Sequence, residues 1–120
     1  MELRSLNNIN FFIEQESETF IHCGVSILNI SFSLNQEENE LNFFCEVVPI
    51  KGNTIPNDIS VVFAFYTKEG KIKILSSLNI WADDFFKIDI ISDCISFSSI
   101  KGLSNFIAEV EKVKIYTKTR

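Results

Sequence analysis

The stretch ISVVFAFYTKEGKIKILSSLNIW, residues 59–81, decides the fold class of this chain. Its first nine residues are apolar on both alternating faces, which is typical of a central β-strand that is covered on both sides. The KEG sequence at 68–70 places a glycine where a tight turn accepts a positive φ. Residues 71–81 then alternate, which predicts four inward side chains: Ile72, Ile74, Leu78 and Ile80. The stretch therefore predicts an antiparallel hairpin whose first strand lies in the centre of a sheet.

Residues upstream of this hairpin predict further strands joined by a loop. The pattern of residues 20–34 is β, but its apolar phase changes by one residue near Leu28, which predicts a bulge. The polar run NQEENE at 35–40 predicts a hairpin loop, and LNFFCEVVPI at 41–50 predicts the antiparallel partner strand. Residues 11–18 predict a short strand that is followed by an acidic turn.

Residues downstream of the hairpin predict short strands and a helical turn. FFKIDII at 85–91 and SDCISF at 92–97 each have the pattern of a short strand. Residues 104–111 predict a helical turn, with an N-cap at Ser104 or Asn105, and the residues after it predict a closing strand. The assignment of 104–111 to helix or strand stays open, because both periods fit its apolar residues.

The composition agrees with a β fold of one domain. Isoleucine occurs 18 times and phenylalanine 12 times in 120 residues, whereas alanine occurs three times. β-Branched and aromatic side chains pack well on pleated sheets, and the scarcity of alanine disfavours helix bundles. About seven to nine short strands in a chain of this length predict a single all-β domain, residues 1–120, built as an antiparallel β-sandwich in preference to a small barrel. Residues 1–10 are predicted to be a polar lead-in that frays or adds an edge strand.

The hairpin segment VVFAFYTKEGKI, residues 61–72, resembles the central hairpin of immunoglobulin-like sandwich modules of the FxLYD type. In that family an alternating strand ends in an aromatic residue, and a charged turn with glycine leads into the next strand. Phe65, Tyr66 and Gly70 fit this outline, but Tyr66 is followed by Thr67 and the Leu-Tyr-Asp signature is missing. The resemblance implies an immunoglobulin-like sandwich, and it implies no functional site.

The charge is distributed unevenly along the chain. There are 16 acidic and 11 basic side chains, the formal net charge is −5, and residues 5–50 hold no Lys or Arg. Because an acidic half repels phosphate backbones, the sequence predicts no nucleic-acid partner and favours a basic protein partner. No apolar run approaches the roughly 20 residues that span a bilayer, and the first ten residues lack the apolar stretch of a signal peptide. We therefore expect a soluble, cytoplasmic protein without a membrane span.

The cysteines and the single histidine form no catalytic or metal-binding pattern. The chain has an odd number of cysteines, Cys23, Cys45 and Cys94, and no two of them form a CxxC pair. This argues against a disulfide framework or a zinc site. Each lies in an apolar run, so each is predicted to be a small buried side chain. His22 is next to Cys23, but adjacent residues of a strand point to opposite faces and cannot form a dyad. The chain also lacks the common catalytic motifs, so it is predicted to be no enzyme and to hold no cofactor or metal.

These observations favour a non-catalytic protein-binding module, with a small bacterial immunity or inhibitor protein as one concrete form. Such a protein would mask the basic surface of a toxin or nuclease with an acidic face. Trp81 lies on the polar phase of its strand, so we expect it to be exposed and to serve as an anchor. The predicted partner-binding residues are Glu14, Glu16, Glu18, Glu37, Glu38, Glu40, Trp81, Asp83 and Asp84.

Two alternative functions stay open. A calcium- or lipid-binding sandwich would gather carboxylates in the loops at one end of the fold. The acids available for such a site are Asp58, Asp83, Asp84, Asp89 and Asp93. A structural subunit of a homo-oligomer, including a homodimer, would instead use the strand edges that an open sandwich exposes.

Overall fold

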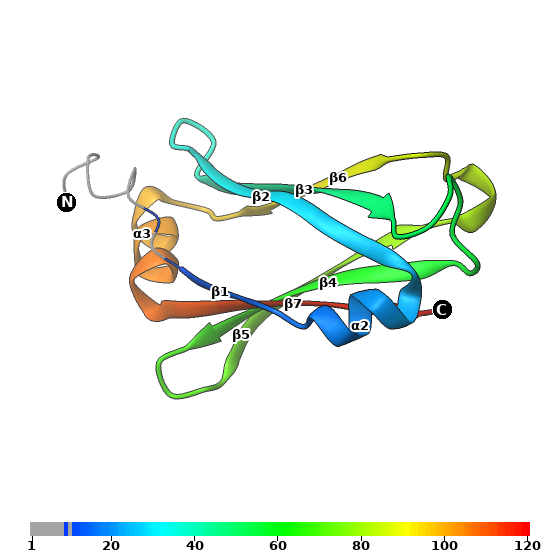
Figure 1. Cartoon of the computed structure of the whole chain (residues 1–120). Coiled ribbons are helices and arrows are strands. Elements are labelled where there is room, and N and C mark those ends of the chain that lie inside the picture. Colours follow the sequence, from blue (N-terminus) through cyan, green and yellow to red (C-terminus); the bar gives the residue numbers. More distant parts are fainter. Residues whose placement is uncertain (1–8, 10) are drawn as a thin grey trace.

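The structure is a computed structural model that describes residue 9 and residues 11–120. The predicted lead-in at 1–10 thus lies, apart from Ile9, outside the described residues. The described part is mostly β and forms two sheets that face each other (Figure 1). No helix in this part is long and apolar enough to cross a membrane.

The two sheets contain four and three strands. The four-stranded sheet has the order β1 (Phe12–Gln15), β7 (Val110–Thr119), β4 (Ile59–Thr67) and β5 (Ile72–Ile80). The three-stranded sheet has the order β2 (Val25–Asn35), β3 (Glu40–Pro49) and β6 (Asp89–Ser96). Helix α2 (Ser17–Cys23) lies beside the four-stranded sheet, α3 (Ile100–Glu109) closes one end of the sandwich, and the short 3₁₀ helix η1 (Ala82–Asp84) lies at the other end (Figure 1).

Strand β4 is the central strand that the sequence predicts. It pairs antiparallel with β5 on one side and with β7 on the other, and every side chain from Ile59 to Phe65 is buried. Gly70 has a φ of 81° in the turn before β5, a conformation that glycine adopts without strain. The inward placement of Ile72 was wrong: a register shift between Phe65 and Tyr66 sets Ile72 opposite Tyr66, where it is 51% exposed.

Phenylalanine rings join the two sheets. The ring centroids of Phe43 in β3 and Phe63 in β4 are 4.8 Å apart, and those of Phe32 in β2 and Phe65 in β4 are 6.3 Å apart. Phe106 of α3 packs 5.6 Å from Phe65, so the helix extends the same cluster at the end of the sandwich. Edge-to-face and tilted ring pairs at these distances are favourable beyond the area that they bury. The high phenylalanine content is thus used mainly to fill the core.

Helix α2 replaces the start of the strand predicted at 20–34. It ends at Gly24, whose φ of 77° lets its N–H donate to Ile21 O, and β2 begins at the next residue. The Thr19 hydroxyl ties the helix to the sheet, because it accepts a hydrogen bond from the Thr117 N–H at 3.0 Å. The predicted bulge near Leu28 is confirmed by a register shift between Leu28 and Ser31 against β3.

The helical turn predicted at 104–111 is correct in kind and wrong in its start. Helix α3 begins at Ile100, because Ser99, not Ser104 or Asn105, is the N-cap and accepts a hydrogen bond from the Gly102 N–H at 3.1 Å. The helix ends at Glu109, and β7 follows without a loop. The helix reading, which the sequence left open, is therefore confirmed for residues 104–109, whereas Val110 and Glu111 belong to β7.

The two strands predicted at 85–91 and 92–97 are one strand, β6. The residues before it are irregular: Lys87 has a φ of 67°, and its N–H donates to Asn53 O at 2.7 Å. This hydrogen bond links the loop before β4 to the loop before β6. Phe85 is buried in the core and Phe86 is exposed, as expected for adjacent aromatic residues that cannot share one core.

Candidate functional site

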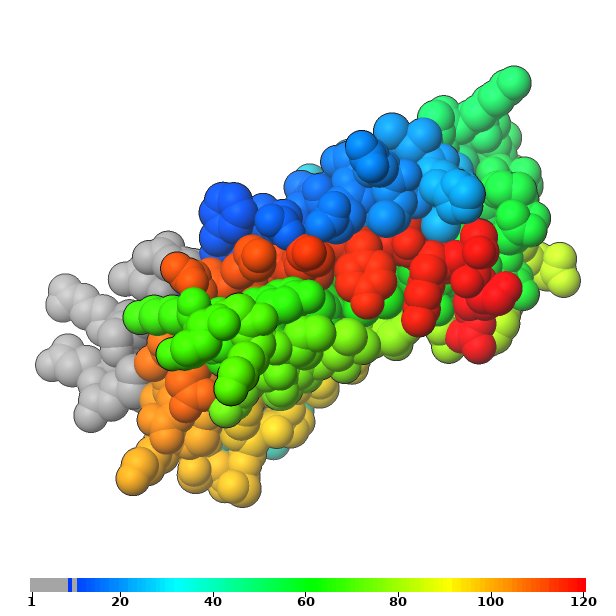
Figure 2. Space-filling model, turned by 90° about the horizontal axis from the view of Figure 1, so that it is seen from below, coloured from blue at the N-terminus to red at the C-terminus, as the bar shows by residue number. Residues whose placement is uncertain are grey.

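The two sheets differ in the charge of their strands. Strands β2, β3 and β6 contain four carboxylates and no Lys or Arg, whereas the four-stranded sheet contains four lysines and two glutamates. Three of those lysines lie on β7, which runs along the middle of the outer face of its sheet in Figure 2 (orange to red). The uneven charge of the sequence thus becomes a difference between the two sides of the sandwich.

The outer face of the three-stranded sheet carries exposed apolar side chains around one carboxylate. Phe44 lies between Ser31 and Ser92 in the strand register, and its side chain is 39% exposed because these neighbours are small. In the next row Glu46 lies between Leu28 and Ile90, which are 44% and 63% exposed. We call the surface formed by Leu28, Phe44, Glu46 and Ile90 the Phe44 face. Antiparallel sheets usually present polar side chains to water on this side, so the three exposed apolar residues make this face a candidate interface.

Glu40 lies on the same outer face at the end of β3. Its carboxylate accepts hydrogen bonds from Ser96 Oγ at 3.1 Å and Cys94 Sγ at 3.6 Å, which hold it in place. The prediction that Cys94 is buried was wrong: Cys94 pairs with the outward residue Asn42 and is exposed, whereas Cys23 and Cys45 are buried as predicted. Glu37 and Glu38 precede Glu40 in the turn between β2 and β3, where Asn35 Oδ1 accepts a hydrogen bond from the Glu38 N–H. Three of the predicted acidic residues therefore lie at one end of the three-stranded sheet, and the row of Asn42 and Cys94 separates Glu40 from Phe44 on its outer face.

The predicted residues Glu14 and Glu16 lie on the opposite side of the sandwich and already have basic partners. Lys114 Nζ is 3.4 Å from a Glu14 oxygen and 3.3 Å from a Glu16 oxygen, and Lys112 Nζ is 3.8 Å from Glu14. The hydrogen bond to Glu16, helped by Glu14, raises the pKa of Lys114. Glu18 is exposed in the first turn of α2, beside the same sheet. These glutamates are separate from Glu46 of the Phe44 face and from the glutamates of residues 37–40.

The predicted residues Trp81, Asp83 and Asp84 lie at the end of the sandwich away from Glu40. Trp81 is 45% exposed, as the sequence indicates, but the Arg120 guanidinium lies 4.7 Å from its ring centroid and covers part of the ring. Asp83 and Asp84 are in η1, which is anchored because the Asp58 carboxylate accepts the Ala82 N–H at 2.7 Å. The nine predicted residues therefore occupy three separate places.

The described residues offer little for nucleophilic or metal chemistry. None of them form a group of three or more His, Cys, Asp or Glu side chains that could hold a metal ion. Burial, with a smaller effect of the Glu46 charge, raises the pKa of the Cys45 thiol to about 12, so this thiol is protonated at neutral pH. His22 and Cys23 are in a helix, not in a strand as the sequence indicated, and His22 is exposed whereas Cys23 is buried.

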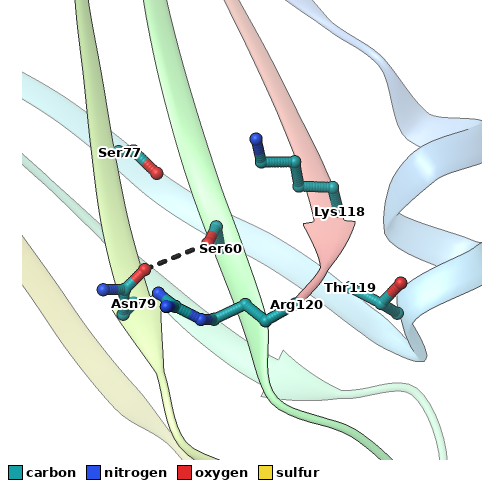
Figure 3. A pocket seen from close by; sticks show the side chains of 6 residues that line it. All are labelled: Ser60, Ser77, Asn79, Lys118, Thr119 and Arg120. Atoms are coloured by element: carbon teal, nitrogen blue, oxygen red, sulfur yellow. Dashed lines mark hydrogen bonds between the residues drawn. The ribbon is translucent and has the colours of Figure 1, made fainter.

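A hollow of about 500 Å³ lies on the outer face of the four-stranded sheet (Figure 3). It forms where small side chains of β4 and β5 lie beside long basic side chains at the end of β7. The residues that line it are Ser60, Ser77, Asn79, Lys118, Thr119 and Arg120. None of these residues was among the predicted site residues, because they come from three strands that only the fold brings together.

Phe44 and Glu46 were also missed, although the sequence contains a signal for them. Leu41, Phe43 and Cys45 alternate along the strand that the sequence predicts at 41–50, and a strand that buries these three residues places Phe44 and Glu46 outside. Comparisons with models of protein families, with curated proteins and with solved structures found no significant match to this chain. The chemistry of the two outer faces is therefore the basis for a function.

Proposed function

We propose that the chain is a non-catalytic binding module that recognises a basic protein through the Phe44 face. The observation that carries this proposal is the juxtaposition of exposed Phe44, Leu28 and Ile90 with Glu46, on three strands without a single Lys or Arg. An aromatic anchor with an acidic surround is suited to a partner whose surface combines an apolar pocket with lysine or arginine side chains.

The geometry supports a relocated form of the acidic interface that the sequence predicts. Glu37, Glu38 and Glu40 extend the negative charge from Glu46 along the outer side of β3 and into the turn before it. Glu14 and Glu16 do not contribute, since lysines of the same chain neutralise them. A small cytoplasmic immunity or inhibitor protein that masks a basic toxin or nuclease is the concrete form of this proposal.

The test is an affinity capture from a lysate of the source organism, compared between wild type and matched variants. Phe44→Ser removes the anchor, and Glu46→Gln removes the central charge. Leu75→Ser and Glu111→Gln make the same kinds of change at exposed residues of the other sheet. Each capture is run at about 0.1 M and about 0.5 M salt, because screening weakens interactions between exposed charges.

The expected result is one basic protein that wild type and both control variants retain at low salt. Phe44→Ser should lose it at both salt concentrations, and Glu46→Gln should lose part of it at low salt. Equal capture by all four variants would place the interface elsewhere. Capture that does not weaken at high salt would contradict the electrostatic part of the proposal.

We further propose that the sandwich is of the immunoglobulin-like type. What supports this proposal is the strand number, seven divided four and three, and the Phe65, Tyr66 and Gly70 outline of the FxLYD modules in the β4–β5 hairpin. The strand orders differ from those of a seven-stranded immunoglobulin domain, because β2 and β7 lie in the opposite sheets, so the proposal concerns the sandwich architecture and not the exact topology. An experimentally determined structure, compared strand by strand with such domains, tests this assignment.

A further inference from the structure

The hollow on the four-stranded sheet is distinct from the Phe44 face and lies on the opposite side of the sandwich. Ser60 of β4 forms its floor and is only 3% exposed. In the strand register Ser60 lies between Asn79 of β5 and Lys118 of β7. Figure 3 shows these side chains with Arg120 around the floor of the hollow.

The lining of the hollow is rich in hydrogen-bond donors. Lys118 and Arg120 supply an ammonium and a guanidinium, and Ser77 supplies a hydroxyl group, whereas the Thr119 side chain points away from the hollow (Figure 3). Asn79 Oδ1 is already used, because it accepts a hydrogen bond from Ser60 Oγ at 3.0 Å, and this leaves the amide NH₂ of Asn79 as a donor. No carboxylate side chain lines the hollow.

The two cations of the hollow, Lys118 and Arg120, differ from the other basic residues of the four-stranded sheet in having no salt bridge among the described residues. Lys73, Lys112 and Lys114 each form a salt bridge with a glutamate. Among the described residues, neither Lys118 nor Arg120 has a carboxylate partner within salt-bridge distance. Both cations are therefore available to an anion, although the net charge of the protein is −5.

Arg120 is also held in position. Its backbone N–H donates a hydrogen bond to the backbone oxygen of Asp58 at 3.0 Å, and its guanidinium lies over the Trp81 ring, 4.7 Å from the ring centroid. A guanidinium fixed by stacking loses less freedom when it binds an oxyanion, and its fork of N–H groups matches phosphate geometry. This contact gives Trp81 a positioning role in the hollow.

We propose that this hollow binds a phosphate group, either free or as the monoester of a small molecule. The uncompensated pair Lys118 and Arg120 supplies the charge, and the donors of Ser77 and Asn79 supply the neutral hydrogen bonds. A volume of about 500 Å³ exceeds that of inorganic phosphate and falls within the range of small-molecule sites, so the remainder of a monoester fits beside the phosphate. The hollow shares no residue with the Phe44 face, so this proposal stands or falls separately from the proposed function.

The experiment is an NMR titration of the backbone amides with inorganic phosphate and, separately, with glycerol 3-phosphate. Sodium chloride at matched ionic strength is the control for screening. We expect saturable shifts at residues 60, 77, 79 and 119, with a Kd for inorganic phosphate of about 1–10 mM. A lower Kd for glycerol 3-phosphate would identify the monoester as the ligand class, and equal values would identify the phosphate group itself.

The variant Lys118→Gln/Arg120→Gln removes both cations, and Lys101→Gln/Lys68→Gln removes two exposed lysines elsewhere as a matched control. The first variant should bind at least about tenfold more weakly, since it loses two charge-assisted hydrogen bonds. The control variant should bind as wild type does. Shifts that do not saturate, or equal affinities of the two variants, would overturn the proposal.

Discussion

Phe43 and Phe44 are neighbours in β3 and have opposite surroundings. The ring of Phe43 is buried against Phe63 and Phe65, whereas Phe44 stands exposed between serines. We expect Phe43→Ala to lower the free energy of unfolding by about 3–5 kcal/mol, through lost burial and a cavity, and Phe44→Ala to lower it by less than about 1 kcal/mol. Urea denaturation followed by circular dichroism measures both. Equal effects would mean that the alternation of β3 is not as described.

Thr117 faces the core from β7 and is 3% exposed. Among the described residues its hydroxyl is the one buried side-chain polar atom without a hydrogen-bond partner. Thr117→Val replaces this hydroxyl with a methyl group of similar size, so we expect the free energy of unfolding to rise by about 1 kcal/mol. Thr119→Val at the exposed end of the same strand should change it little. A loss of stability in Thr117→Val would show that the hydroxyl is satisfied in solution.

Cys45 makes the stability of the fold depend on alkaline pH. Its pKa rises from 9.0 to about 12 in the folded state, so the folded thiol keeps a proton that the unfolded chain releases above pH 9. The unfolded state then binds fewer protons, and the free energy of unfolding falls as pH rises from 9 to 12, by at most about 1.4 kcal/mol per pH unit. Denaturation midpoints between pH 8.5 and 11 should therefore fall more steeply for wild type than for Cys45→Ala. Midpoints that fall equally with pH in wild type and Cys45→Ala would show that the Cys45 thiol is not the cause.

Helix α3 depends on a cap at Ser99, five or six residues before the positions that the sequence predicted. Ser99 Oγ accepts the Gly102 N–H, so Ser99→Ala should cost about 1 kcal/mol of stability. Ser98→Ala, one residue earlier and exposed, is the matched control and should be nearly neutral. Thermal unfolding of the two variants measures the difference. If both melt together, the cap does not contribute to the stability of the helix.

The strands were predicted more reliably than the helices, for physical reasons. In β4 and β3 the alternation of side chains and the burial act in the same direction, so the hairpin at 59–81 and the inward face of 41–47 could be predicted. In α2 the apolar residues Phe20, Ile21 and Cys23 also fit a strand, and the helix is held by a contact between Thr19 and Thr117 that is distant in sequence. No local pattern reports such a contact.

The candidate surfaces also depend on contacts between residues that are distant in sequence. Alternation along β3 places Phe44 and Glu46 outside, but it does not show that Leu28 and Ile90 flank Glu46. The hollow could not be predicted, because Ser60, Asn79 and Lys118 meet through pairing between three strands. The charge pattern did indicate an acidic surface, and it could not show that lysines of β7 neutralise Glu14 and Glu16.

The edges of the two sheets carry features that discourage pairing with another chain. Strand β1 has only four residues, β2 has a bulge with Asn29 at a φ of 53°, and β5 has a register shift and Lys73. In β6 the Asp93 carboxylate lies at the open side of the sandwich and accepts a hydrogen bond from Ser76 Oγ of β5 at 2.7 Å. Bulges, short strands and charges that point inward are devices that prevent edge-to-edge association.

Asp93→Val removes the charge from the edge of β6. We expect this variant to associate more strongly than wild type, seen as a higher apparent mass at equal concentration in sedimentation velocity. Asp93→Asn keeps a polar partner for Ser76 and should sediment as wild type does. Circular dichroism establishes that both variants are folded. Identical sedimentation of all three proteins would show that Asp93 does not protect this edge.

The position of β7 sets the order in which the molecule can be assembled. It is the last strand along the chain, yet it lies between β1 and β4, with Phe12 aligned beside Lys112. The β2–β3 and β4–β5 hairpins have local contacts and can form as they leave the ribosome, but β1 and β4 have no partner for their facing edges until residues 110–119 are made. Pairing across such a separation is slow, and the open edge beside Phe63 and Phe65 is prone to aggregation in the meantime. The edges of β1 and β4 that face each other therefore stay open until residues 110–119 have been made, and only then can the four-stranded sheet close.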